Sequence, residues 1–236
     1  MLTFYILAII VVFLGVVIGL PGALHINPIL LHFFEPHTVT FLTTVLLLMT
    51  SLSSIVIFWK HIQWRDGLYL SLYGALGGAI GGLLFGYLPP QLVVILFFAS
   101  GFSFLWNHYH KKEQPLSRYG LFVSGFLTSF LQAFGISAGA LRRAFLLSKG
   151  YSIQEIYGTI AVAYTVSGGG IVITRMVNEH IPFSLLHQIL VLFPVIFITV
   201  VIGKKMMGLF SKKIQEFIVV YSLVVSLLLA IPYLFK

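Results

Sequence analysis

Long apolar segments, separated by short polar breaks, follow one another along the whole chain of 236 residues. A bilayer crossing needs about 20 apolar residues, so this length allows roughly eight membrane helices and leaves no room for a separate soluble domain. Only 8% of the residues are charged and 59% are hydrophobic, whereas an ordinary soluble domain carries about 25% charged residues. The pattern excludes a soluble globular enzyme and a disordered chain, and it predicts an all-α, polytopic membrane protein.

Several chemistries lack the residues that they require. The sequence contains no cysteine, which excludes disulfides, thiolate metal sites and cysteine nucleophiles. It also contains no phosphate-binding loop, no His-Glu-x-x-His zinc motif and no nucleophile elbow, so we expect neither an enzyme nor a primary pump, with no cofactor and no bound metal. The net charge of +8 is typical of the cytoplasmic loops of a membrane protein and does not indicate nucleic-acid binding.

The apolar segments predict helices, two of which are too short to span a membrane. The expected helices are 3–20, 23–34, 37–59, 67–88, 90–109, 119–136, 139–149, 153–176, 182–203 and 212–234. The short ones, 23–34 and 139–149, follow the glycine-containing breaks 19–22 and 135–139. Irregular backbone at membrane depth survives only when it is buried in protein or lines a cavity. We therefore expect 3–34 and 119–149 to be re-entrant hairpins whose tips meet inside the membrane.

The distribution of basic residues supports the hairpins. If both segments return to their starting side, most of the basic residues share one side of the membrane, and only Arg175 and Lys236 lie opposite. The shared side holds Lys60, Arg65, Lys111, Lys112, Arg118, Lys149, Lys204, Lys205, Lys212 and Lys213. If both segments instead crossed the membrane, the basic residues would divide almost evenly between the two sides. The positive-inside rule thus favours hairpins in a multi-pass protein of the cytoplasmic membrane, with the basic loops cytoplasmic and both termini outside.

The two hairpins align with each other without a gap. Gly22-Ala23-Leu24 falls on Gly139-Ala140-Leu141 at an offset of 117 residues. The expected repeats are 1–110, with the hairpin 3–34 and the helices 37–59, 67–88 and 90–109, and 119–236, with the hairpin 119–149 and the helices 153–176, 182–203 and 212–234. Three crossings are an odd number, so the second repeat begins on the opposite face. Inverted repeats of this kind are typical of secondary transporters, whose binding sites lie at the midplane.

These motifs resemble the sulfite-exporter (TauE/SafE-like) permease family. Its members are similar in having two four-helix halves, each opening with a glycine-rich segment and a proline shortly after. The matching residues here are Gly15, Gly19-Leu20-Pro21-Gly22 and Pro28, then Gly125, Gly135 and Gly139, and finally Gly203 with Lys212-Lys213. The chain lacks the family's fuller Gly-Gly-Gly pattern at both breaks, so the resemblance does not fix the substrate. It implies transport of small sulfur oxyanions, organosulfonates or related organic anions.

The tips of the two hairpins are the candidate binding site. Helices that begin just after Gly22 and at Gly139 would direct their free N–H groups and partial positive charge at the membrane centre, an arrangement that favours an anion. The glycines also fit a purely structural role in a tight hairpin.

Arg142 and Arg143 follow within one turn of the second tip, and a planar guanidinium suits the oxygens of a sulfonate or carboxylate. We expect only one of them to face the site, since adjacent residues differ by about 100° around a helix. The alternative is that both extend to the cytoplasmic surface.

Other polar residues are expected to complete the site. His25 falls on Arg142 in the repeat alignment, so it is expected across the same cavity as a hydrogen-bond donor or a titrating group, or as a purely structural histidine. Asn27 supplies a further donor or caps the broken helix. The remaining candidates for substrate contact are Thr50, Ser51, Gln132, Ser137, Ser167 and Gly168. Each also fits a helix-packing role, because Ser, Thr and Gly mediate close contacts between membrane helices.

Two groups of glycines are expected to act through packing or bending. Gly74, Gly78, Gly82 and Gly86 recur every four residues with Gly77 and Gly81 beside them, which predicts a face for close helix approach. Gly168-Gly169-Gly170 lies inside an expected helix and fits a bend or hinge, and Pro194 is expected to kink its helix.

The sequence thus predicts a secondary transporter of small sulfur-containing or organic anions that works by alternating access. Its expected partners are the anionic substrate and the lipid bilayer. A coupling proton or cation and a homodimer are left open. The alternatives are a cation or metal carrier and a non-transporting membrane scaffold.

Overall fold

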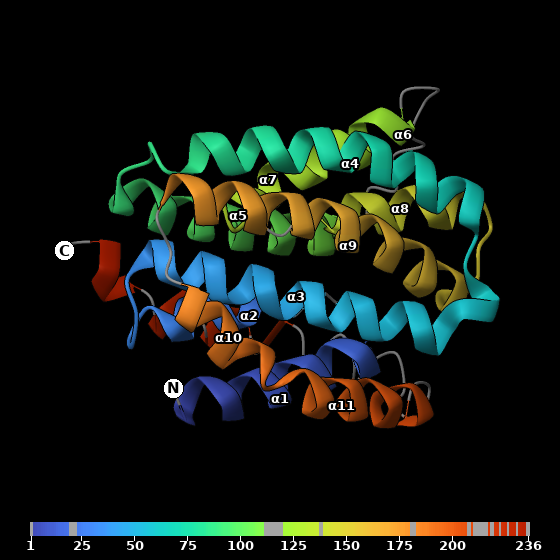
Figure 1. Cartoon of the computed structure of the whole chain (residues 1–236), viewed down its shortest axis with the longest axis horizontal. Helices are drawn as coiled ribbons and strands as arrows, with labels where there is room; N and C mark the ends of the chain where they lie inside the picture. The colour runs from blue at the N-terminus through green and yellow to red at the C-terminus, as the bar shows by residue number, and fades with distance from the viewer. Residues whose placement is uncertain are drawn as a thin grey trace.

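The computed structural model of the chain describes residues 2–18, 23–110, 120–136, 139–179 and 183–206, and beyond these 209, 217, 220–221, 223–225, 227–229 and 231–234. Some side chains within these ranges, that of His25 among them, lie outside the description. The described backbone is helical or lies in short turns, which confirms the predicted all-α class (Figure 1).

The first half of the chain forms α1 (Leu2–Ile18), α2 (Ala23–Leu30), α3 (Pro36–Phe58) with the 3-10 turn Trp59–His61, α4 (Trp64–Phe85) and α5 (Pro90–His110). The second half forms α6 (Gly120–Phe122), the π-helical turn Val123–Leu127, α7 (Thr128–Ala133), α8 (Gly139–Ser148), α9 (Ile153–Asn178), α10 (Phe183–Leu190), α11 (Phe193–Met206) and the 3-10 turn Ile231–Leu234. The expected last helix, 212–234, falls largely outside the described residues.

Membrane-spanning helices are present, as the apolar composition predicts. Within the described residues, four helices are long and apolar enough to cross a membrane, namely Pro36–His61, Trp64–Phe85, Ile153–Asn178 and Leu186–Met206. At about 1.5 Å per residue, α2 and α8, of 8 and 10 residues, are too short to cross a core about 30 Å thick. The chain is therefore an integral membrane protein that combines membrane-spanning helices with helices too short to cross.

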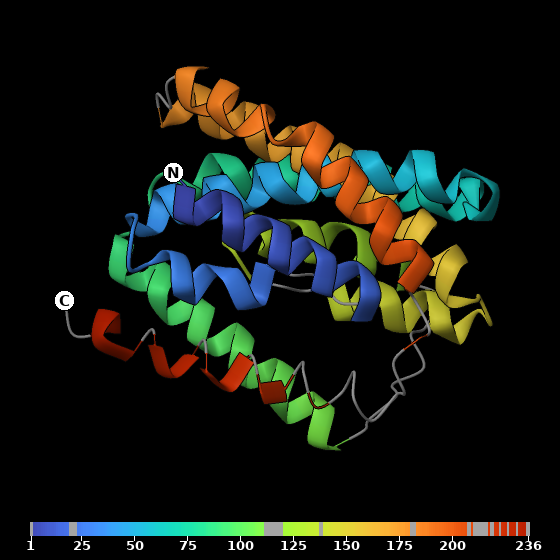
Figure 2. The same cartoon turned by 90° about the horizontal axis from the view of Figure 1, so that it is seen from below.

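Both short helices return toward the end of the molecule where their segment began. The start of α1 and the turn from α2 into α3 lie at the same end in Figures 1 and 2. In the second segment, the Phe122 ring packs 5.5 Å from that of Tyr73 on α4, and Lys149, just after α8, bonds Asp66 near the start of α4. This is the course that a hairpin takes, while the inverted relation between the repeats stays a prediction.

Helix α4 lies between α7 and α9, and its glycines permit the close approach. A Cβ at Gly81 would lie 2.8 Å from the Phe130 carbonyl oxygen, on the α7 side. A Cβ at Gly78 would lie 2.8 Å from the Ser167 carbonyl oxygen, on the α9 side. Both distances are too short for a real side chain, so the predicted packing role of this glycine stripe is confirmed.

The glycine triplet behaves differently from the α4 stripe. Helix α9 runs without interruption from Ile153 to Asn178, through Gly168-Gly169-Gly170. A Cβ at Gly169 would meet nothing within 4 Å, and one at Gly168 would make only ordinary contact with Leu48. Packing therefore does not explain a glycine at position 169.

A two-residue turn interrupts the helix expected over 182–203. Helix α10 ends at Leu190 and α11 begins at Phe193, yet Leu186–Met206 together still form one apolar stretch long enough to cross the membrane. Pro194 has no N–H to bond the Leu190 carbonyl, so a regular helix would leave that carbonyl without its partner. The turn therefore lies where a kink at Pro194 is expected.

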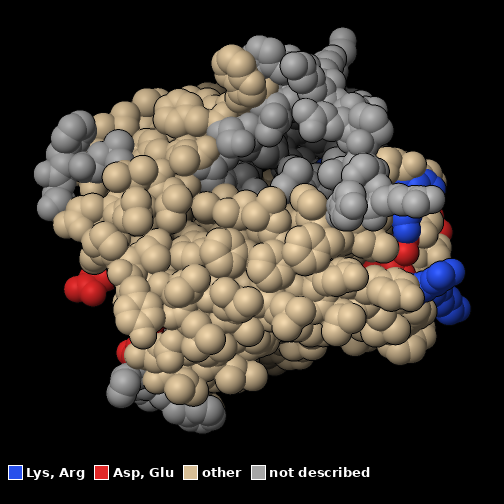
Figure 3. Space-filling view, turned by 90° about the horizontal axis from the view of Figure 1, so that it is seen from above, with Lys and Arg blue, Asp and Glu red and all other residues tan. Residues whose placement is uncertain are grey.

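Basic side chains gather at one end of the molecule, where α3 ends and α4 begins. Lys and Arg in Figure 3 are visible only at that end of the face shown. Lys149 Nζ lies 2.5 Å from Asp66 Oδ2, and Lys204 Nζ donates to the Ile57 carbonyl at 2.8 Å. These contacts place the ends of α8 and α11 beside the α3–α4 turn. That this end faces the cytoplasm stays a prediction.

Candidate functional site

Arg142 lies deep in the protein, level with the middle of two membrane-spanning helices. Its side chain is 0% exposed and is among the largest fully buried side chains. A Cβ at Gly74, the midpoint of α4, would lie 3.6 Å from Arg142 Nη2. The guanidinium also stacks 4.5 Å from the ring centroid of Tyr164, in the middle of α9. Helix α8 thus carries a guanidinium into the centre of the protein.

Neutral oxygens on the preceding helical segment hold Arg142. Its Nε donates to the Ser124 carbonyl at 3.2 Å, and its Nη2 donates to the Gly125 carbonyl at 3.4 Å and to Ser129 Oγ. Ser124 and Gly125 belong to the π-helical turn Val123–Leu127, and turns of this kind are frequent at functional sites. The remaining terminal nitrogen, Nη1, is buried and has no hydrogen-bond partner among the described residues.

The positive charge of Arg142 is not balanced within the part of the chain that the structure describes. The ion pairs there join His37 and Arg175 to Glu179 and Lys149 to Asp66, and none involves Arg142. An uncompensated guanidinium at membrane depth costs several kcal/mol, so its usual partner is a ligand or a proton pathway. The arrangement is suited to an anion that approaches Nη1.

Gln132 and Asn27 continue the polar series from Arg142 toward the hairpin tip. Gln132 lies three residues after Ser129, on the same face of α7, and is 7% exposed. Both of its amide atoms are buried without partners. Its backbone carbonyl accepts from Gly135 N–H, and the Gly135 carbonyl accepts from Asn27 Nδ2 at 3.3 Å. The last bond joins α2 of the first hairpin to the tip of the second.

The other predicted residues of the second half have different surroundings. Ser167 lies beside Arg142 at Gly74, but its hydroxyl donates to the Ala163 carbonyl of its own helix at 2.9 Å. Arg143 is only half-buried, so of the two adjacent arginines Arg142 is the one that faces the interior. Gly139 is buried at the start of α8, and Gly168 is buried against α3.

Several predicted residues are not joined to Arg142 by any contact described. Thr50 lies on α3 and donates to the Leu46 carbonyl at 2.8 Å, and Ser51 is buried on the same helix. Gly22, Ser137 and the side chain of His25 fall outside the described residues.

The direct partners of Arg142 were not predicted. Which residues face α8 depends on how the neighbouring helices are rotated about their own axes. This holds for the segments that carry Ser124, Ser129 and Tyr164. The π-helical turn shifts that rotation, and it has no clear mark in the sequence. The spacing of Arg142 from Ser124 and Ser129 across a hairpin tip was the available signal.

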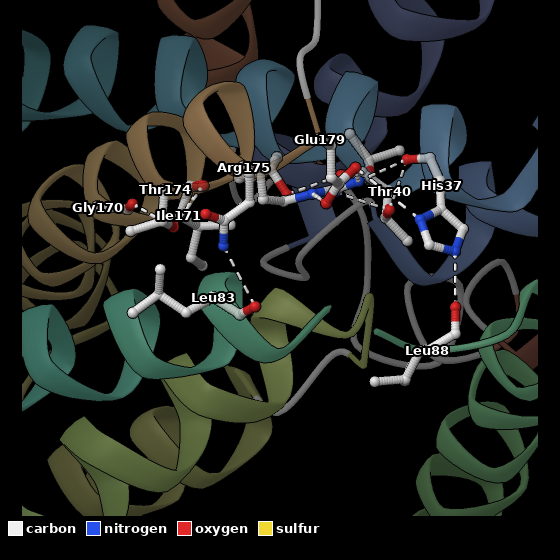
Figure 4. Close-up of polar contacts among 12 residues, drawn as sticks. His37, Thr40, Leu83, Leu88, Gly170, Ile171, Thr174, Arg175 and Glu179 are labelled. Atoms are coloured by element: carbon white, nitrogen blue, oxygen red, sulfur yellow. Dashed lines mark hydrogen bonds and ion pairs between the residues drawn. The ribbon is translucent and has the colours of Figure 1, made fainter. Parts of the chain in front are cut away.

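A second buried arginine lies near the end of α9 that is remote from the basic end (Figure 4). Arg175 is 0% exposed and makes two bonds to Glu179, from Nε at 2.6 Å and from Nη2 at 2.7 Å. It also donates to Thr40 Oγ1 and to the His37 carbonyl, each at 2.8 Å. The Phe85 ring centroid lies 4.1 Å from its guanidinium carbon. Unlike Arg142, this arginine has an internal carboxylate and is fully engaged.

His37 extends this group to a third element. Its Nδ1 lies 3.9 Å from Glu179 Oε2, and its Nε2 lies 3.0 Å from the Leu88 carbonyl, to which it donates (Figure 4). Burial alone would raise the pKa of Glu179, but His37 beside the carboxylate and the bonds and charge of Arg175 hold that pKa below its ordinary value. We call His37, Arg175 and Glu179 the far-end cluster.

A smaller polar group lies at the basic end. Asp66 Oδ2 accepts from Lys149 Nζ at 2.5 Å and from the Tyr151 hydroxyl at 2.9 Å. Burial, and then the bond to Asp66, raise the pKa of Tyr151. We call Asp66, Lys149 and Tyr151 the basic-end cluster. It joins the start of α4 to the α8–α9 turn.

Comparison with known proteins gives a family match that covers nearly the whole chain. A family model described as sulfite exporter TauE/SafE matches residues 4–229. No curated protein and no solved structure gives a significant match. Among the described residues, no group of three His, Asp or Glu side chains is placed to hold a metal ion.

Proposed function

Because this chain belongs to the sulfite exporter TauE/SafE family, we propose that it is a secondary transporter of small sulfur-containing or organic anions. The substrate class comprises sulfite, sulfonates and carboxylates. The protein carries them across the cytoplasmic membrane by alternating access, with its basic end in the cytoplasm and both termini outside.

The observation that carries this proposal is the charge of Arg142. The guanidinium is fully buried, level with the middle of α4 and α9, and bonded only to neutral oxygens. A buried positive charge without a carboxylate is stabilised when an anion occupies the site. An oxyanion offers several acceptor oxygens, one of which takes the bond that Nη1 lacks.

The start of α8 adds to the attraction for an anion. Arg142 lies three residues from the first residue of that helix, Gly139, and the first N–H groups of a helix have no partners within it. The helix dipole places about half a positive charge at this end. Arg142 and the helix terminus therefore act on the same ligand from one short helix.

The two polar clusters are suited to act as gates at opposite ends. The basic-end cluster joins α4 to the α8–α9 turn, and the far-end cluster joins α3, the turn after α4 and the end of α9. Arg142 lies between them along α9. In alternating access only one end opens at a time, so each cluster must separate in turn.

The packing of the long helices supports an inverted repeat. Helix α4 packs against α9 and α7, and α11 packs against α3 and α1. In the alignment of the two halves, α3 corresponds to α9, α4 to α11 and α1 to the segment that ends in α7. Each half thus contributes the same set of contacts.

Flux into proteoliposomes tests the function. Purified full-length protein is reconstituted, and uptake of sulfite, ethanesulfonate and acetate is measured for the wild type, Arg142→Gln and Arg65→Gln. Arg65 is an exposed arginine at the basic end and is the matched control. We expect uptake of at least one anion, lost about tenfold or more in Arg142→Gln and retained in Arg65→Gln.

Binding and stability measurements separate the alternatives. Thermal unfolding of Arg142→Gln shows whether loss of uptake reflects misfolding, and Arg142→Lys retains the charge if the glutamine variant fails to fold. Uptake of divalent cations in place of anions supports the carrier of cations or metals. A folded protein that moves no solute supports the alternative function of a non-transporting membrane scaffold. Uptake at the wild-type rate by both Arg142 variants would show that Arg142 is not part of the binding site.

A further inference from the structure

We infer that the anion taken by this site carries its own hydrogen-bond donor, an O–H or N–H group close to the charged oxygens, and that Asn27 and Gln132 recognise that group. The inference rests on the proposed function and concerns which member of the anion class is preferred. The inference follows from which atoms of the buried side chains lack a partner, because some of these atoms can only accept a hydrogen bond.

Asn27 presents a buried acceptor. Its Nδ2 lies 3.3 Å from the Gly135 carbonyl oxygen, which can only accept, so the orientation of the amide is fixed by its surroundings. The opposite atom, Oδ1, is buried and has no partner in the part of the chain that the structure describes, and the side chain is 2% exposed. A carbonyl oxygen in this position is satisfied only by a donor.

Gln132 presents a second acceptor together with a donor. Both Oε1 and Nε2 are buried and have no partner among the residues described, so either orientation of the amide offers one atom of each kind. A buried polar atom without a partner has lost its hydrogen bonds to water and gained none in return. Side chains so placed are expected to find their partners in a ligand.

The charge and the acceptors follow one another in space. Arg142 bonds Ser129, Gln132 lies one turn further along α7, and the Gly135 carbonyl holds Asn27. Residues three apart on a helix are separated by about 4.5 Å along its axis. Gln132 therefore lies about one turn beyond the partner of Arg142, and Asn27, bonded at Gly135, lies further along the same direction. This order matches a small molecule with an oxyanion near Arg142 and a donor group directed toward Gln132 and Asn27.

A ligand with acceptors only does not fit this series. An unsubstituted sulfonate satisfies Arg142 Nη1 and one amide N–H, but it places no hydrogen on Asn27 Oδ1 or Gln132 Oε1 and leaves both desolvated. A hydroxyl or amino group on the same molecule, or the proton of a singly protonated sulfur oxyanion, supplies the missing hydrogen. Sites built to bond a hydroxyl reject the analogue without it strongly, because their own groups are then unpaired.

A matched pair of probes tests the inference. Binding of ethanesulfonate and of 2-hydroxyethanesulfonate to the purified full-length protein is measured by titration calorimetry. We expect the hydroxylated anion to bind about tenfold tighter or more. Gln132→Met keeps the length of the side chain. In this variant the ratio of the two affinities, hydroxylated over unsubstituted anion, falls toward one because affinity for the hydroxylated anion drops. Asn27→Leu gives the same direction of change. Thr199→Val is the control, since the hydroxyl of Thr199 bonds its own helix at Val195.

The outcomes distinguish the inference from the function on which it rests. Equal affinity for the two sulfonates, or a ratio that Gln132→Met leaves unchanged in a protein that still binds, overturns the inference and leaves anion transport intact. Absence of binding to both sulfonates, to sulfite and to acetate overturns the proposed function and the inference together.

Discussion

Two arginines on one membrane protein illustrate how much the partner of a side chain decides its role. Arg175 is bonded to a carboxylate four residues away, so its charge is internally balanced. Arg142 is equally buried but is bonded only to carbonyl and hydroxyl oxygens. The first is suited to hold helices together, and the second is suited to hold a ligand.

The Glu179 carboxylate is expected to stabilise the folded protein only above acidic pH. Its pKa is depressed in the folded state, so its contribution is complete above the ordinary pKa of a glutamate and is lost as the pH falls through the folded value. Glu179→Gln should lower the stability at pH 7 by about 3 kcal/mol, because it leaves Arg175 buried without its carboxylate. Thermal unfolding in detergent at pH 7 and near pH 4 measures this.

The control for this prediction is Glu35→Gln, since Glu35 is exposed. The difference in stability between wild type and Glu179→Gln should begin to narrow near pH 4, because the carboxylate of the unfolded wild type takes up a proton there while the depressed pKa keeps the folded one charged. A gap of the same size at both pH values would show that the pairing is not electrostatic.

At the residue scale, the sequence predicted which charged residues belong to the candidate site better than it predicted which residues contact them. The absence of a nearby acidic residue marked Arg142 and Arg143 as candidates, and burial then separates them. The i, i+4 spacing of Arg175 and Glu179 was also visible, but its burial depends on Thr40, His37 and Phe85, which come from distant parts of the chain.

Helix α4 offers a direct comparison between glycines that pack and glycines that do not. In Gly78→Ala the new Cβ would lie 2.8 Å from the Ser167 carbonyl oxygen, so α4 must move away from α9. We expect this substitution to lower the free energy of unfolding by about 1–3 kcal/mol. In Gly169→Ala the new Cβ meets nothing within 4 Å, and the better helix propensity of alanine should leave stability unchanged or raise it by up to about 1 kcal/mol.

Unfolding midpoints of the two variants in the same detergent give the result. If Gly169→Ala destabilised the protein as much as Gly78→Ala, the open space at position 169 would be filled by something other than this chain. A stable Gly169→Ala that transports slowly would indicate that α9 bends there during the cycle.

Helices were predictable from apolar length, and their interruptions only in part. The hydropathy and the glycine breaks separated α2 and α8 from their neighbours. Pro194 signalled a distortion between α10 and α11 but not the length of the turn, because that depends on which partner the Leu190 carbonyl finds. The π-helical turn at Val123–Leu127 has no such mark in the sequence, and it lies against α4, where Gly125 approaches Tyr73 and Leu70 closely.

On the scale of the whole molecule, the two ends of the bundle are expected on opposite sides of the membrane. Because the chain has no cysteine, single cysteines label without background. Glu35→Cys should react with an impermeant thiol reagent added outside intact cells, and Lys60→Cys only after permeabilisation. Both positions are exposed in the structure. Labelling of both from the same side would contradict this topology.

Counting charges predicts that the basic loops share one end of the bundle, and the ends of α8 and α11 do lie together beside the α3–α4 turn. That this end faces the cytoplasm stays a prediction from the positive-inside rule. The order of helices along the bundle followed from two hairpins that each return to their starting side. How α4 is enclosed by α7 and α9 did not follow, since that depends on which glycine face meets which carbonyl.

The neutral cradle around Arg142 has an electrical consequence. When a monovalent anion binds, the occupied centre carries no net charge, whereas the vacant centre keeps one positive charge. Moving a unit charge across the whole membrane against a potential of 100 mV costs about 2.3 kcal/mol. In the proposed transport cycle, the membrane potential therefore bears on the return of the vacant protein and leaves the passage of the occupied one almost untouched.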